Sequence, residues 1–339
     1  MMNYKSLASI ATVAVAVLAL AGCGNSGDVP EASDGKPVIR ILGAGAADFT
    51  GLSTEKWQQE LKAAGYEVDF KFVESPDDAA RIVIAGAADF FLGSPPEGIS
   101  AILGAGAPLM ALAFTEQAST FVVLGDKSIN SLDELVGKKV ALNTPGSTPN
   151  VIFDIANQIE GVDATQIEQI TLGAGPARMA ALQGGQVDAT VVHFAEALAV
   201  VESGDFHVIQ DTGEILGQYL QQGLFASTVF TDKYPEATQD VIDVLLDSFR
   251  WAADNKEGYM ALADNYDFDL TDAQRAEAYD KLVANGFFPV NGSANDIPAV
   301  EEWVKRSQSA GAIPADVIPL DEWLDNSYVM DSIERNGEF

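Results

Sequence analysis

The stretches that decide the fold are Arg81–Leu92, RIVIAGAADFFL, and Ala180–Val191, AALQGGQVDATV. Each holds the end of a helical pattern, a glycine that stops the helix, an aspartate and an apolar run typical of a buried strand. Three pairs match at a constant offset of 99 residues: Gly86 with Gly185, Asp89 with Asp188, and Glu97 with Glu196. We therefore predict two similarly built α/β lobes, because the offset is far longer than a solenoid repeat. A chance similarity between two βαβ units is the alternative.

Strands and helices alternate around both stretches, which is typical of parallel sheets built from βαβ units. Before the first crossover we predict strands at 38–42, 68–73 and 89–92, and helices at 54–64, 77–85 and from about 97 through 103. The second lobe begins with a strand at 139–142 and a helix at 150–159. Later we predict a strand at 224–229 and amphipathic helices at 239–254, 272–284 and 299–309. The apolar runs 121–124 and 224–229 flank the second lobe, so we expect them to be two crossing strands that act as hinges.

Composition excludes some classes of function. The 339 residues include 19 Lys and Arg against 50 Asp and Glu, a formal net charge of −31. A field of this sign repels nucleic acid, so we expect no nucleic-acid partner. The two histidines, His193 and His207, do not lie in a ligand-spaced cluster, so we expect no metal site. We interpret the acidity as a solvated surface.

The N-terminus has the pattern of a secretory signal. Lys5 precedes an apolar run over 7–21 that is too short for a comfortable membrane span, and small residues precede Cys23. We predict a signal peptide over 1–22. Cys23 is the only cysteine, so no disulfide can form within the chain. Residues 23–36, rich in Gly, Ser, Pro and Asp, are predicted to be a flexible tether. A simple signal peptide followed by a free cysteine is the alternative.

Several motifs carry a resemblance to a known family. The Leu20-Ala-Gly-Cys23 ending resembles the bacterial lipobox, which implies cleavage before Cys23 and lipid on its sulfur. The pattern is completed by three further stretches: SLDELVGKKV at 131–140, Gly-Ser-Thr at 146–148 and ALQGGQVDA at 181–189. The chain thus resembles the solute-binding lipoproteins of bacterial ABC importers, in the branch for nitrate, sulfonate, taurine and thiamine precursors.

The resemblance implies a type II periplasmic-binding-protein fold, in which two lobes joined by two crossovers close on a small molecule. It implies that 37–122 plus 226–339 form lobe one and that 123–225 form lobe two. It also implies a monomeric extracytoplasmic protein that is anchored to a membrane and delivers its ligand to a permease, without a cofactor. Acidic lobe tips would dock on basic permease loops, and salt would weaken this docking.

Candidate ligand-binding residues lie in the loops after the strands, because open α/β sheets bind ligands beyond the carboxyl ends of their strands. They are Gly45, Ala46, Gly93, Ser94, Glu116, Gln117, Gly146, Ser147, Thr148, Gly175, His193, Phe194 and Glu196. The strongest candidate is the segment 146–148, at a helix start where free backbone N–H groups favour an anion or a polar oxygen. A plain N-cap by Ser147 or Thr148 is the alternative.

The charges near these loops favour one class of ligand. Arg178 is the nearby cation, whereas Asp48, Glu97, Glu116 and Glu196 are acidic. We therefore expect a pyrimidine or another amine-bearing heterocycle, with a sulfonate, nitrate or taurine ligand as the alternative. A lipoprotein sensor not coupled to transport stays open. We do not expect an enzyme: the related enzyme that makes the thiamine pyrimidine relies on a cysteine-rich motif and iron, and Cys23 is used by the lipid.

Overall fold

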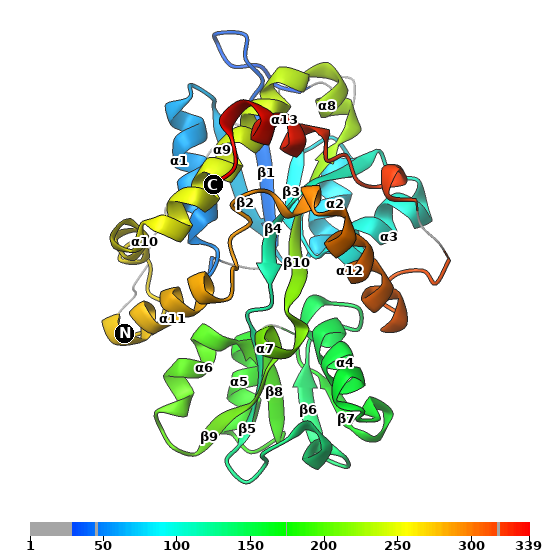
Figure 1. Ribbon diagram of the computed structural model, residues 1–339, viewed down its shortest axis with the longest axis vertical. Coiled ribbons are helices and arrows are strands. Elements are labelled where there is room, and N and C mark those ends of the chain that lie inside the picture. The colour runs from blue at the N-terminus through cyan, green and yellow to red at the C-terminus, as the bar shows by residue number, and fades with distance from the viewer. Residues whose placement is uncertain (1–28, 45–46, 174, 317–318) are drawn as a thin grey trace, which may run out of the picture.

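The computed structural model describes residues 29–44, 47–173, 175–316 and 319–339. They form two α/β lobes stacked along the long axis of the molecule and joined in the middle by extended backbone (Figure 1). The predicted signal peptide 1–22 and the lipid attachment at Cys23 lie outside the described residues. Within the described part of the chain, no helix combines the length and apolar character that a membrane span requires.

The first sheet has the strand order β2-β1-β3-β10-β4. Its strands are β1 (Ile39–Ala44), β2 (Val68–Val73), β3 (Phe90–Gly93), β4 (Leu109–Ala118) and β10 (Gln218–Ser227). The strands β1, β2 and β3 are parallel, whereas β10 runs antiparallel to β3 and β4. The helices of this lobe are α1 (Leu52–Ala63), α2 (Pro76–Ile84), α3 (Pro95–Ala105), α8 (Thr228–Lys233), α9 (Pro235–Asp254), α10 (Lys256–Ala263), α11 (Asp272–Ala284), α12 (Ile297–Ser309) and α13 (Ser327–Asn336).

The second sheet has the order β7-β6-β8-β5-β9. Its strands are β5 (Phe121–Asp126), β6 (Lys139–Leu142), β7 (Glu168–Thr171), β8 (Ala189–His193) and β9 (Phe206–Asp211), with helices α4 (Thr148–Glu160), α5 (Gly175–Gln183), α6 (Phe194–Val201) and α7 (Thr212–Leu216). The strands β6, β7 and β8 are parallel, and β5 is antiparallel to β8 and β9. The two sheets therefore share one plan, position by position, which confirms the prediction of two similarly built α/β lobes.

The paired aspartates have the same role in both lobes. The backbone N–H of Arg40 donates to Asp89 Oδ2 at 3.3 Å, and that of Lys139 donates to Asp188 Oδ2 at 2.8 Å. In return, the N–H of Asp89 donates to the Arg40 carbonyl at 2.9 Å, and that of Asp188 to the Lys139 carbonyl at 2.8 Å. Each aspartate thus ties the start of one inner strand to the start of the next, which explains why the motif recurs.

The crossovers do not lie where the sequence predicted them. The run 121–124 belongs to β5 inside the second sheet, and 224–227 is the end of β10 inside the first. Val229, expected in that strand, lies in α8. Between β4 and β5 the backbone crosses at 119–120, and it returns to the first sheet at Gln218, which pairs with Ala118. Residues 218–225, expected in lobe two, therefore follow the first sheet. Apolar runs mark buried strands, whereas the crossing backbone is short and polar.

Part of the predicted tether is not a free linker. Val29 is buried in the core, and the hydroxyl of Tyr234 donates to the carboxylate of Glu31 at 2.8 Å. Lys36 Nζ donates to the carbonyl of Ala64 at 3.1 Å. The expectation of flexibility is therefore wrong for residues 29–36, because specific contacts with the first lobe hold them; 23–28 lie outside the described residues.

Two helices of the first lobe reach the second lobe, on opposite sides of the crossovers (Figure 1). From α11, Lys281 forms a salt bridge with Asp211, and Gln274 Nε2 donates to the Leu198 carbonyl at 3.2 Å. From α12, the residues in contact are Ser309, whose hydroxyl donates to Gln158 Oε1 at 3.2 Å, and Arg306, which donates to the Leu216 carbonyl at 2.7 Å. These contacts set the angle between the lobes.

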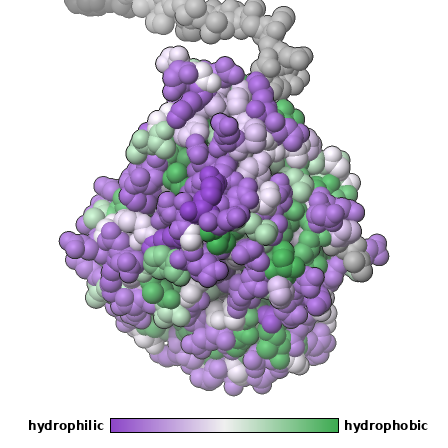
Figure 2. Space-filling model, turned by 45° about the horizontal axis from the view of Figure 1, so that its top comes forward, coloured by the Kyte–Doolittle hydropathy of each residue, from purple (hydrophilic) through white to green (hydrophobic). Residues whose placement is uncertain are grey.

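The outer surface is mostly hydrophilic on the face shown in Figure 2, with smaller apolar areas between. This agrees with 50 acidic side chains in the sequence. Apart from Phe72, which contacts Phe70, the exposed large hydrophobic side chains are single residues of different elements, among them Val136, Ile159, Val229 and Met330. Isolated exposed apolar residues of this kind are normal for globular proteins.

Candidate functional site

The carboxyl ends of the inner strands face the crossovers in both lobes. Gly93, at the end of β3, pairs with Gly223, which among the β10 residues paired with β3 is the one nearest the crossover. His193, at the end of β8, pairs with Phe121, the first residue of β5. Because β10 and β5 meet the crossovers at these ends, the loops after the parallel strands of each lobe point toward the other lobe (Figure 1). Ligands of open α/β sheets bind at such edges.

A cavity of about 70 Å³ lies at this edge of the first sheet. Its lining is acidic and aromatic: Gly43, Ala44, Ala47, Asp48, Gly51, Leu52, Thr54, Glu55, Gln58, Phe70, Phe72, Leu92, Glu116, Gln222 and Tyr266. Three of these residues are carboxylic acids, and no lining residue is Lys or Arg. The first lobe therefore offers its ligand hydrogen-bond acceptors and aromatic surface rather than cations.

Glu116 is the buried acid of this cavity. The residue is 9% exposed, and Gln221 Nε2 donates to its Oε2. Burial is the main cause that raises the pKa of Glu116 to about 8; the charge of Asp48 raises it further, and the hydrogen bond from Gln221 opposes both. Near neutral pH the carboxyl group is therefore mostly protonated, so it can donate as well as accept.

Asp48 is held in place by its own loop. Its Oδ1 accepts hydrogen bonds from the backbone N–H groups of Thr50 and Gly51, at 2.8 and 2.9 Å, and from the Thr50 hydroxyl at 2.6 Å. Across the cavity, the hydroxyl of Tyr266 donates to Glu55 at 3.2 Å. These contacts give the cavity a rigid acidic rim.

An aromatic wall closes one side of the cavity. Phe72 is 48% exposed and packs edge-to-face on Phe70, with ring centroids 5.2 Å apart. A Cβ atom on Gly43 would lie 2.9 Å from the Phe72 ring, so glycine at this position lets the ring close over β1. An exposed ring beside fixed carboxyl groups suits a flat ligand that carries donors.

In the second lobe, the segment 146–148 lies at the start of α4 as expected. Ser147 takes the N-cap position but does not cap with its side chain; its hydroxyl donates to Asn150 Oδ1 at 3.0 Å. Ser147 is buried and Gly146 has a φ of +86°, which favours glycine. The N–H groups of Thr148 and Asn150 lack carbonyl partners within the helix, as in any first turn. This edge therefore offers hydrogen-bond donors.

Gly175 and Glu196 come together, whereas Arg178 is not available to a ligand. A Cβ atom on Gly175 would lie 3.1 Å from both carboxylate oxygens of Glu196. Arg178 is 4% exposed, and its guanidinium donates to the carbonyls of Val191 and Gly173. The arginine thus holds the loop after β7 onto β8.

His193 is partly exposed at the end of β8. Its Nδ1 lies 2.7 Å from the Thr120 hydroxyl, and its ring stacks on Phe121 with centroids 4.2 Å apart. Among the described residues, Nε2 has no hydrogen-bond partner. His193 therefore has one nitrogen fixed by the crossover and the other free for a ligand.

Other predicted site residues have structural contacts. Gln117 Nε2 donates to the carbonyls of Gly286 and Phe288, and Phe194 is buried beneath Lys281. Gly93 lies against Phe91, and Ser94 is buried with no partner for its hydroxyl in the described chain. Gly45 and Ala46 lie outside the described residues.

Sequence reasoning missed the polar groups of the crossovers. Gln221 contacts Glu116 and Thr120, and Gln222 Oε1 accepts a hydrogen bond from the Thr115 hydroxyl at 2.9 Å. The available signal was the Gln221-Gln222 pair, which interrupts an apolar run directly before the predicted strand at 224–229. Tyr266, far along the chain, carried no comparable signal.

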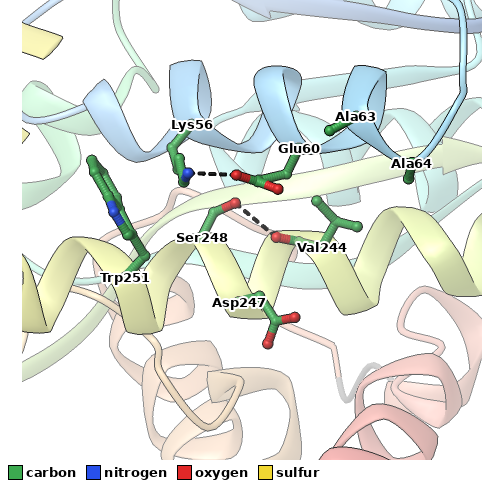
Figure 3. A pocket seen from close by; sticks show the side chains of 8 residues that line it. All are labelled: Lys56, Glu60, Ala63, Ala64, Val244, Asp247, Ser248 and Trp251. Atoms are coloured by element: carbon green, nitrogen blue, oxygen red, sulfur yellow. Dashed lines mark hydrogen bonds and ion pairs between the residues drawn. The ribbon is translucent and has the colours of Figure 1, made fainter. Parts of the chain in front are cut away.

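A larger groove of about 500 Å³ lies outside the space between the lobes, between α1 and α9 (Figure 3). Trp251 borders it, and Lys56 and Glu60 pair with each other along its wall. The Ser248 hydroxyl donates to the Val244 carbonyl of its own helix, at 2.7 Å. These polar side chains already have partners within the protein, and no strand end in the described chain borders the groove. We therefore do not assign the ligand to it.

Comparisons with known proteins agree with this geometry. The profile of the family described as NMT1/THI5 like matches residues 46–258. No curated protein matches the chain. The aliphatic sulphonate binding protein SsuA from Escherichia coli has a TM-score of 0.64 at 18% identity, over 85% of this chain and 92% of its own.

Two further solved structures show the range of this fold. A ligand binding component of an ABC-type import system from Staphylococcus aureus, with zinc bound, has a TM-score of 0.71 at 11% identity, over 87% of this chain and 98% of its own. The desulfurization enzyme DSZB has a TM-score of 0.61 at 13% identity, over 88% and 99%. At these identities the likeness establishes the periplasmic-binding-protein fold, as the sequence predicted.

Proposed function

Since the chain belongs to the NMT1/THI5-like family, we propose that it is the solute-binding protein of an ABC importer and captures a small molecule between its lobes. The observation that carries the proposal is the pair of strand edges that face each other across two short crossovers, each with polar groups. Closure about the crossovers would bury the ligand between both edges.

We propose an amine-bearing heterocycle, such as a pyrimidine, as the ligand class. The first lobe supports this choice with Asp48, Glu55 and Glu116 beside the exposed ring of Phe72, and no Lys or Arg lines that cavity. A ring can stack on Phe72 while its amino group donates to a carboxyl group.

A sulfonate or related oxyanion is the second candidate. The specific observation in its favour is the donor-rich start of α4, where the N–H groups of Thr148 and Asn150 are free of intrahelical partners. A sulphonate-binding protein shares the fold at 18% identity. Against this reading, Arg178 is occupied by carbonyl groups of the second lobe.

We propose binding without turnover, delivery to a permease, and anchorage through acylated Cys23 outside the cytoplasmic membrane, with a monomeric protein in solution. Mass spectrometry of the N-terminal peptide tests the anchor: we expect a lipid on Cys23, and an unmodified thiol on the intact chain would contradict it. A ligand-sensing lipoprotein would bind the same ligand but would not stimulate a permease ATPase.

The experiment that tests the function is a thermal-shift screen of the soluble protein lacking residues 1–23, with mass spectrometry of any ligand it retains. The screen covers pyrimidines and other heterocyclic amines, sulfonates, taurine and nitrate. A ligand at a hundredfold excess over its dissociation constant stabilises the folded state by about 2.7 kcal/mol. A shift with amines supports our choice, a shift with sulfonates alone contradicts it, and recovery of a chemically altered compound would contradict simple binding.

Matched variants assign a positive result to the site. Glu116→Gln replaces a carboxyl group of the cavity with an amide, whereas Glu168→Gln changes an exposed side chain on β7. We expect only the first to weaken binding of a heterocyclic amine. Equal effects of both variants would move the ligand away from the cavity.

A further inference from the structure

Four polar side chains form a continuous hydrogen-bonded chain across the hinge. Gln221 Nε2 donates to Glu116 Oε2 and also to Thr120 Oγ1, the latter at 2.9 Å. Thr120 Oγ1 lies 2.7 Å from His193 Nδ1. The chain starts in β4 of the first lobe, passes through β10 and the crossover at 119–120, and ends in β8 of the second lobe. It therefore links one cleft group of each lobe through the hinge.

A backbone group fixes the orientation of the Gln221 amide in this chain. The N–H of Thr120 can only donate, and it donates to Gln221 Oε1 at 3.0 Å. The other terminal atom of Gln221 is therefore its NH₂ group, whose two hydrogens point to Glu116 and Thr120. Glu116 Oε2 then acts as an acceptor, the role that suits the carbonyl oxygen of a protonated carboxyl group, so we assign a carboxyl proton of Glu116 to Oε1.

The same logic reaches the histidine. The Thr120 hydroxyl accepts a hydrogen bond from Gln221, and among the described residues His193 Nδ1 is the acceptor within reach of its own hydrogen, so we assign that hydrogen to the bond with Nδ1. Nδ1 is then an acceptor, and the neutral ring carries its hydrogen on Nε2. Nε2 is the atom that has no partner among the described residues.

We propose that Gln221 and Thr120 are positioning residues, which set the hydrogen-bonding pattern that the two lobes present to the ligand: Glu116 Oε1 from the first lobe and an Nε2–H donor from His193 in the second. This inference rests on the proposed function and deepens it. The ligand that fits must offer an acceptor, such as a ring nitrogen or carbonyl, to the second lobe. Closure then carries both groups onto one molecule, because the chain runs through the residues about which the lobes turn.

The first test needs no ligand. Nitrogen-15 NMR of the imidazoles in alkaline solution reports which ring nitrogen carries the hydrogen. The spectrum is simple because the chain has only His193 and His207. His207 is an internal control, because its Nε2 faces the carbonyl of Ile129 and must carry a hydrogen whatever occurs at Thr120. We expect the Nε2–H form at His193; a predominant Nδ1–H form would overturn the inference.

Two variants separate positioning from folding. Thr120→Val keeps the shape of the side chain but removes the hydroxyl, so His193 should become a mixture of tautomers; Thr120→Ser restores the hydroxyl and the Nε2–H form. The His207 signal should stay unchanged in both. A His193 signal unaffected by Thr120→Val would contradict the proposal.

The second test is calorimetric titration with 4-aminopyrimidine as the probe. We expect Thr120→Val to weaken binding by about three- to tenfold, as for loss of one neutral hydrogen bond, and Thr120→Ser to bind like the unaltered protein. Equal affinity of Thr120→Val would overturn the inference. If the unaltered protein does not bind the probe, the proposed ligand class fails, while the tautomer at His193 still decides the positioning claim.

Discussion

The two lobes share a backbone plan but use it for different chemistry. Both have the same strand order, and an aspartate at the same place in each, Asp89 and Asp188, ties two inner strands together. Asp89 is 1% exposed and also holds the guanidinium of Arg40, whereas Asp188 is partly exposed and, among the described residues, its carboxylate accepts only from the backbone N–H of Lys139. The backbone bond is therefore the shared requirement, and the buried ion pair belongs to the first lobe alone.

The glutamates that follow also differ. Glu97 has a buried carboxyl oxygen with no partner in the described chain, and burial, followed by the charge of Asp77, raises its pKa to about 7. Glu196, its counterpart, lies against Gly175 in the second lobe. The first lobe thus gathers carboxyl groups of raised pKa at its strand edge, while the second presents a helix start. One plan has produced an acidic face opposite a donor face.

The largest expected effect concerns Arg40, whose ion pair with Asp89 has no equivalent at Asp188 in the described chain. Arg40→Met would leave Asp89 buried without its counter-charge, and we expect a loss of about 3–5 kcal/mol in the free energy of unfolding. Lys139→Met is the matched control, because Asp188 needs only the backbone there; we expect a change within about 0.5 kcal/mol. Urea unfolding monitored by circular dichroism measures both. Equal losses would mean that the two aspartates have the same energetic role.

The next effect concerns pH. The folded pKa of Glu116, about 8, lies above its ordinary value of 4.5. The folded state therefore holds this proton more tightly than the unfolded state, and the contribution to stability is complete below about pH 4.5 and is lost as pH rises through about 8. Glu116→Gln should remove this loss, worth up to about 5 kcal/mol.

The measurement is the free energy of unfolding from pH 4 to 9 for the unaltered protein and for the variant. Glu97→Gln is the comparison. Because the pKa of Glu97 is about 7, this variant should remove a smaller part of the loss of stability with rising pH, and that part should end at a lower pH. Parallel pH curves for Glu116→Gln and the unaltered protein would show that burial does not perturb this carboxyl group.

Much of the fold could be predicted from the sequence, because the signals that specify it lie close together in the chain. A glycine stop, an aspartate and an apolar run specify a helix, a turn and a buried strand within a dozen residues, so the paired units around Asp89 and Asp188 could be predicted. The crossovers could not, because Ser119 and Thr120 form no periodic pattern and the apolar runs beside them mark strands. The prediction of a flexible tether failed from Val29 onward for a similar reason. The composition of the segment suggests flexibility, but single contacts such as that of Tyr234 with Glu31 hold it against the first lobe.

The candidate site was predictable only in part. The rule that ligands bind at strand ends identified Glu116, Ser147 and His193 at the facing edges, but it also selected Gln117, whose side chain is bound to carbonyls of a distant loop. Gln221 was missed because its importance comes from three partners that are far apart in sequence. Long-range side-chain contacts of this kind leave no pattern in a single chain.

A smaller effect is expected where the helices that follow β3 and β8 differ. Gly98 of α3 and Ala197 of α6 differ by 99 residues, but a Cβ atom on Gly98 would lie 2.3 Å from the Phe225 ring. Gly98→Ala should therefore cost about 1–3 kcal/mol through overpacking. Gly104→Ala, in the same helix with open space, should be neutral or stabilise by up to about 1 kcal/mol. Thermal unfolding measures both; a stabilising Gly98→Ala would show that Phe225 can move freely.

The smallest effect tests the contact between the lobes. Lys281→Met removes the partner of Asp211 across the lobes, and we expect a loss of about 1 kcal/mol or less together with a more open average shape. Lys256→Met, which removes the salt bridge to Asp280 within the first lobe, should leave the shape unchanged. Small-angle scattering gives the radius of gyration of each. An identical radius for Lys281→Met would mean that this ion pair does not hold the lobes together.

The central claim, that two unlike strand edges close on one ligand, can be measured directly by distance. A soluble form that lacks residues 1–23 has no cysteine, so Glu74→Cys and Thr144→Cys place two dyes on exposed positions after β2 and β6. We predict that energy transfer between the dyes rises when a stabilising ligand is added, and that Glu116→Gln requires more of a heterocyclic amine for the same rise. Saturable binding with no change in energy transfer would contradict closure of the lobes on the ligand.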